Sequence, residues 1–129
     1  MMDGPQIIRD VLITNVYVAH PATGKATRPY LIAEMDVATH RIVQASVSLS
    51  LPAPRADRAV SYGRPQKMSA IEKWFRVYGL QCEKSFRTYV SREDRSPRFL
   101  PVPLPTIREF AEHVEAYVQQ YNAQLGREG

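Results

Sequence analysis

Three apolar segments joined by short turns fill the first 51 residues, and this pattern limits the possible folds most strongly. Residues 7–18 are rich in β-branched and aromatic side chains, which favour strands. Residues 30–35 form a second apolar segment, and residues 41–51 follow after a tight connection at 36–40. In this last segment apolar and polar residues alternate, as in a strand with one solvated face. The sequence therefore predicts a three-stranded antiparallel meander.

The composition changes after residue 51. Residues 52–65 combine proline and arginine with little periodicity, which is typical of a basic loop. From residue 66 the apolar residues recur at helical spacing, at Met68, Ile71, Phe75 and Tyr78. This helix either ends at Gly79 or runs on through Leu80 and Phe86.

A second helix is predicted after an irregular, proline-containing connection at residues 91–105. Thr106 and Glu109 have the spacing of a capping box: the threonine hydroxyl accepts from a first-turn amide, and the glutamate reaches back. An apolar face follows and ends near Gly126. The expected fold class is α+β, a single domain with a β-meander at 1–51, a basic loop at 52–65 and a helical part at 66–129.

The composition narrows the environment and the partners. A length of 129 residues fits one domain. The net charge of +4 indicates weakly a polyanionic partner. Cys82 is the only cysteine, so no disulfide can form within the chain, and no apolar run approaches membrane-spanning length. We therefore expect a cytoplasmic protein with no membrane partner.

Two carboxylates stand out by their settings. Asp10 lies within an apolar segment, where a carboxylate is costly unless it is paired or bound to a cation. Glu72 follows the basic loop at the start of the first helix. Carboxylates on a strand and a helix can converge on Mg²⁺ or Mn²⁺, which prefer oxygen ligands. The alternative is that Asp10 faces water and Glu72 pairs with Arg76 one helical turn on.

Four blocks resemble the catalytic core of the phage Mu-type DDE transposases, in the order that this family has them. Residues 10–18 (DVLITNVYV) are similar to its first strand, which carries the first catalytic aspartate. Residues 28–43, ending in DVATHRIV, are similar to its second strand, turn and third strand. Residues 63–75 (GRPQKMSAIEKWF) are similar to the segment around its catalytic glutamate, and residues 121–128 (YNAQLGRE) resemble the end of the core.

The resemblance implies an RNase H-like core that catalyses phosphoryl transfer on DNA with two metal ions. Asp10 would bridge the metals and Glu72 would bind one of them. The family's second aspartate lies on a fourth strand reached through a helix, and residues 52–62 are too few for both. Asp57 lies in this gap but lacks an apolar strand around it. The sequence therefore predicts a truncated core that binds Mg²⁺ or Mn²⁺ weakly and is catalytically impaired.

DNA is the partner that the resemblance implies. The expected phosphate contacts are the basic residues around the loop and the first helix: Arg55, Arg58, Arg64, Lys67, Lys73 and Arg76. A solvated basic face is the alternative for the same residues. Asp36 is expected to bond to the backbone of its own turn and to have no catalytic role.

Three hypotheses of function remain open at this point. The chain is a degenerate transposase remnant with DNA affinity, an active enzyme whose missing aspartate comes from Asp57 or from another chain, or a small non-catalytic module that modulates a full-length transposase. A truncated sheet would also leave an unpaired strand edge, which favours self-association.

Overall fold

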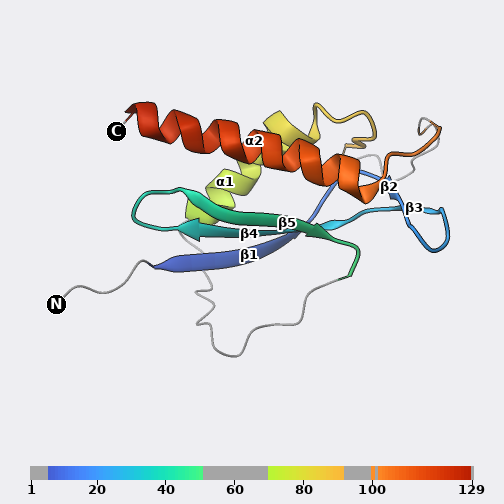
Figure 1. Ribbon diagram of the computed structural model, residues 1–129, viewed down its shortest axis with the longest axis horizontal. Helices are drawn as coiled ribbons and strands as arrows, with labels where there is room; N and C mark the ends of the chain where they lie inside the picture. The colour runs from blue at the N-terminus through green and yellow to red at the C-terminus, as the bar shows by residue number, and fades with distance from the viewer. Residues whose placement is uncertain (1–5, 51–69, 92–99, 101, 129) are drawn as a thin grey trace.

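The sheet has the predicted meander order. The computed structural model describes residues 6–50, 70–91, 100 and 102–128. Strands β1 (Ile7–Ile13), β4 (Tyr30–Asp36) and β5 (Ile42–Ser48) form a three-stranded antiparallel sheet in the order β1-β4-β5 (Figure 1). The α+β class with a three-stranded antiparallel sheet and following helices is thus confirmed.

The first apolar segment does not form one strand. β1 ends at Ile13. The backbone N–H and the hydroxyl of the buried Thr14 still donate to the Pro29 carbonyl opposite, at 3.0 and 2.9 Å, but Pro29 has no N–H with which to continue the ladder. The chain then turns away, and β2 (Val18–Ala19) pairs with β3 (Ala26–Thr27) in a small separate sheet. The prediction of one strand over residues 7–18 is therefore wrong beyond Ile13.

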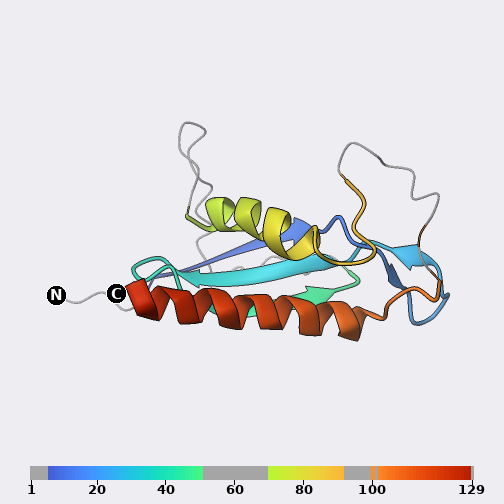
Figure 2. The same ribbon diagram turned by 90° about the horizontal axis from the view of Figure 1, so that it is seen from above.

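One face of the main sheet packs against the helices and forms the core. Leu31, Ala33 and Met35 of β4 are all buried, and alternate residues of β4 lie on the other face. Figures 1 and 2 show α1 (Ala70–Tyr78) and α2 (Ile107–Glu128) side by side on this face. Apolar residues of both helices complete the core: Ile71, Trp74, Phe75, Tyr78, Phe110 and Val114.

The first helix continues past Gly79, but with a different geometry. Residues Gly79–Glu83 form a π-helical turn, η1, in which the Lys84 N–H donates to the Gly79 carbonyl at 3.1 Å. The helix thus runs on through Leu80 but ends at Glu83, before it reaches Phe86. However, Leu80 is 65% exposed and does not extend the apolar face.

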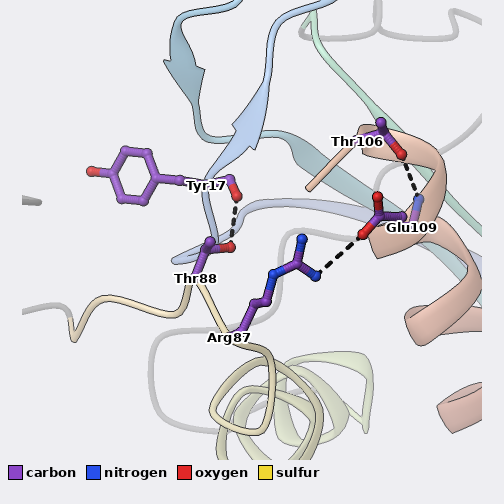
Figure 3. A network of polar contacts seen from close by, with 5 residues as sticks. All are labelled: Tyr17, Arg87, Thr88, Thr106 and Glu109. Carbon is purple, nitrogen blue, oxygen red and sulfur yellow. Dashed lines mark hydrogen bonds and ion pairs between the residues drawn. The ribbon is translucent and has the colours of Figure 1, made fainter. Parts of the chain in front are cut away.

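The start of α2 follows half of the predicted capping box. The Glu109 N–H donates to the Thr106 hydroxyl at 3.1 Å, as predicted. The Glu109 carboxylate instead forms an ion pair with Arg87 at 3.2 Å (Figure 3). Next to it, the Thr88 hydroxyl donates to the Tyr17 carbonyl at 2.6 Å. The segment after η1 is therefore tied both to α2 and to the chain just before β2.

The β4–β5 turn is stabilised by hydrogen bonds within the turn and by hydrogen bonds from α2. The Asp36 carboxylate accepts from the Ala38 N–H at 2.9 Å, which confirms its predicted structural role. The Asn122 amide both accepts from the Ile42 N–H at 3.0 Å and donates to the Ile42 carbonyl at 2.9 Å. The Tyr121 hydroxyl donates to the His40 carbonyl at 2.7 Å. The C-terminal part of α2 is thus fixed to the first residues of β5.

Candidate functional site

Asp10 lies on β1 directly opposite Ala33, so it shares the face of the sheet that the helices cover. It is half-buried, and its Oδ1 atom accepts from the Val11 N–H at 2.8 Å. Asp10 is thus partly exposed to solvent, and the alternative that it faces water stays open.

Glu72 lies in the first turn of α1 and is exposed to solvent. Helix α1 packs against β1, so the elements that carry Asp10 and Glu72 are neighbours. Lys73 and Arg76 are exposed on the same helix. The structure thus brings together the two elements of the predicted site, with two of the predicted basic residues on its solvent side.

A metal centre needs more donors than this pair. In the parts of the chain that the structure describes, no group of three or more His, Cys, Asp or Glu side chains could hold a metal ion. The pair does not match the carboxylate set of a two-metal site. The remaining predicted residues, Arg55, Asp57, Arg58, Arg64 and Lys67, lie outside the described residues.

A buried carboxylate that the sequence did not single out lies at the junction of η1 and the chain after β1. Glu83 is 1% exposed, and its Oε1 atom accepts from the Asn15 N–H at 2.9 Å. Arg28 donates to the Thr14 carbonyl at 2.8 Å and to the Asn15 side chain at 2.9 Å. Glu83 and Arg28 therefore both bind the segment that separates β1 from β2.

The electrostatics of this cluster are dominated by burial. Desolvation raises the pKa of the Glu83 carboxyl, while the Asn15 N–H, the Tyr78 hydroxyl and the Arg28 charge lower it by less. Burial, and next the Glu83 charge, raise the pKa of the Tyr78 hydroxyl far above its usual range. The contact between Tyr78 and Glu83 is close but lacks full hydrogen-bond geometry, since Glu83 Oε2 and Tyr78 Oη have no bonded partner among the described residues.

Helical periodicity could not have revealed Glu83. In an α-helix the fifth residue after Tyr78 points roughly 140° away from it, at 100° per residue. The π turn, whose hydrogen bonds join residues five apart, brings Glu83 back to the buried side. Glu83 is buried and its carboxylate is bonded to the Asn15 N–H, so it holds η1 against the chain after β1.

Cys82 lies next to this cluster, and its thiol should be unreactive in the folded protein. Burial, followed by the Glu83 charge, raises the pKa of Cys82 to about 12. At pH 8 we expect the native thiol to react with a disulfide reagent on the order of a thousandfold more slowly than the unfolded chain, because little thiolate is present. The rate of thionitrobenzoate release with and without denaturant measures this. Equal rates in the two states would contradict it, and Cys82→Ser is the blank.

None of the described helices is both long enough and apolar enough to cross a membrane. No protein-family profile, curated protein or solved structure was found to match the chain.

Proposed function

We propose that this chain is a part of a Mu-type DNA transposase or integrase core, with a truncated RNase H-like fold, that binds DNA and has little or no strand-transfer activity alone. The proposal rests on the four sequence blocks that resemble this family. The observation that best supports it is the packing of α1, which bears Glu72, against β1, which bears Asp10.

DNA binding is assigned to the basic surface of the first helix. Lys73 and Arg76 are exposed on α1, and Lys84 is exposed just after η1. Positive charges on the solvent side of one helical segment suit a phosphate backbone, whose neutralisation releases counterions. Asp10 and Glu72 would supply only part of the ligands of Mg²⁺ or Mn²⁺. Two carboxylates alone should bind either ion weakly, because Mg²⁺ loses its water reluctantly.

The affinity of the chain for a labelled DNA duplex of random sequence can be measured by fluorescence anisotropy. We expect the affinity to fall steeply between 50 and 200 mM salt, by roughly tenfold or more for three or more phosphate contacts. The double variant Lys73→Ala, Arg76→Ala should weaken binding and lower the slope of log affinity against log salt by about two. Arg108→Ala, an exposed arginine on α2 that pairs with Glu112, is the matched control and should bind as the parent does.

Three outcomes would change the proposal. Loss of affinity with Arg108→Ala as large as with the α1 variant would remove the assignment to α1. Robust Mg²⁺-dependent nicking of supercoiled DNA that Asp10→Ala abolishes would show an active enzyme. Binding to a full-length transposase without any binding to DNA would favour the alternative of a non-catalytic module that modulates that enzyme.

A further inference from the structure

Within the described parts of the chain, the outer edge of β5 lacks the usual protection of an edge strand. β5 is the last strand in the order β1-β4-β5, and its seven residues, IVQASVS, include no charged residue and no proline. Among the described residues, no strand pairs with its outer side. Edge strands in monomeric proteins normally carry charges, prolines or a cover, because their free N–H and C=O groups pair with other strands. The bulge opposite Glu34 and Met35 disturbs only the first part of β5.

A groove runs along this edge between β5 and α2. Its volume is about 520 Å³, and the five consecutive residues Val43–Val47 line one wall. Val114 and Val118 of α2 line the opposite wall, with Glu115 beside them. Because consecutive strand residues line it, the groove follows the main chain of β5 for about 17 Å, at roughly 3.4 Å per residue.

At the first residue of β5, Ile42, a side chain of α2 already forms hydrogen bonds to the outer edge of the strand. The side-chain amide of Asn122 donates to and accepts from the backbone of Ile42, as a neighbouring strand's peptide group would. The groove begins at the next residue, Val43, which is 47% exposed. The unprotected stretch Val43–Val47 thus starts where the cover by Asn122 stops.

The position of α2 decides what can occupy the groove. Helix α2 packs chiefly on β5 and lies over it in both Figure 1 and Figure 2. If β5 of a second copy paired with β5 at the strand spacing of about 4.8 Å, the two α2 helices would also be that close. Packed helices need about 8–10 Å between their axes. A second copy therefore does not fit in this way, whereas an extended segment without a helix over it does.

We propose that this groove binds an extended peptide segment of another protein, which adds to the sheet as a fourth strand beside β5. This mode supplies main-chain hydrogen bonds along the strand and pockets for alternate side chains. The apolar lining from Val43, Val114 and Val118 selects small β-branched residues at alternate positions. Glu115, the one ionisable residue among those that line the groove, selects a Lys or Arg in the segment.

The test uses the full chain and synthetic hexapeptides in which valine and threonine alternate, with one lysine at each valine position in turn. At least one should bind saturably in calorimetry, and amide hydrogen exchange in Val43–Val47 should slow on binding. Val43→Lys, which puts a charge on the edge, should weaken binding by tenfold or more. Val77→Lys on α1 is the matched control, because Val77 is exposed to nearly the same degree, 45% against 47% for Val43. It should leave binding unchanged.

The charge preference is tested by Glu115→Lys. This variant should bind the lysine-containing peptide more weakly, and should bind the same peptide with glutamate in place of lysine more tightly. The proposal is overturned if no peptide of the set binds, or if Val43→Lys binds as tightly as the parent chain. It is also overturned if sedimentation shows a dimer of the free protein that Val43→Lys abolishes, since the occupant is then a second copy. None of these variants changes Lys73 or Arg76, so the peptide-binding proposal and the DNA-binding proposal can each fail without the other.

Discussion

Replacing Phe110 by alanine should lower the free energy of unfolding by roughly 3–5 kcal/mol, as for other large-to-small changes at buried aromatic sites. Phe110 is fully buried in the first turns of α2. Its ring lies edge-on to Phe86 at 5.2 Å, so it joins α2 to the segment that follows η1. Truncation therefore removes the buried ring, leaves a cavity and loses an aromatic contact at once.

The measurement is denaturant unfolding followed by the fluorescence of Trp74, which is buried against Tyr78 and Tyr117. Leu80→Ala is the matched control, because Leu80 is also a large apolar residue but is 65% exposed. It should change the free energy of unfolding by less than about 0.5 kcal/mol, as is usual at surface positions. Equal losses from the two variants would show that α2 does not pack on the core through Phe110.

The sequence predicted the parts of the fold that periodicity determines. β4 and β5 follow the apolar segments at 30–35 and 41–51 closely, since a buried face imposes alternation on each strand. The end of β1 at Ile13 could not be predicted, because it depends on which residue lies opposite: Pro29, distant in sequence, has no N–H to continue the ladder. The fold is thus predictable where local pattern and burial agree.

The candidate site divides in the same way. Asp10 is conspicuous in the sequence because a carboxylate in an apolar strand is unusual, and the structure places it on the helix-covered face. Glu83 lies in a polar stretch, so no local signal marked it, and only the π turn after Gly79 explains its burial. The groove beside β5 exists because α2 packs on β5. The sequence predicts the helix but does not specify on which strand the helix packs.

Glu83 is the second position where a substitution should have a large effect, and its two variants should differ in direction. Glu83→Ala leaves the Asn15 N–H without its acceptor in a buried place, which costs roughly 1–3 kcal/mol. Glu83→Gln keeps an oxygen for this bond and removes the charge that burial penalises. At pH 7 we therefore expect the glutamine variant to be at least as stable as the parent, and the alanine variant to be clearly less stable.

The pH dependence distinguishes a buried carboxyl from an ordinary one. Because burial raises the pKa of Glu83 in the folded state above the usual 4.5, the folded chain holds this proton more tightly than the unfolded chain. Its contribution to stability is full below about pH 4.5 and is lost as the pH rises through the folded-state pKa. The stability of Glu83→Gln relative to the parent should therefore grow from pH 4 to pH 8, as measured by urea unfolding. A constant difference would mean that Asn15, Tyr78 and Arg28 together cancel the cost of burial, so that Glu83 is charged in both states.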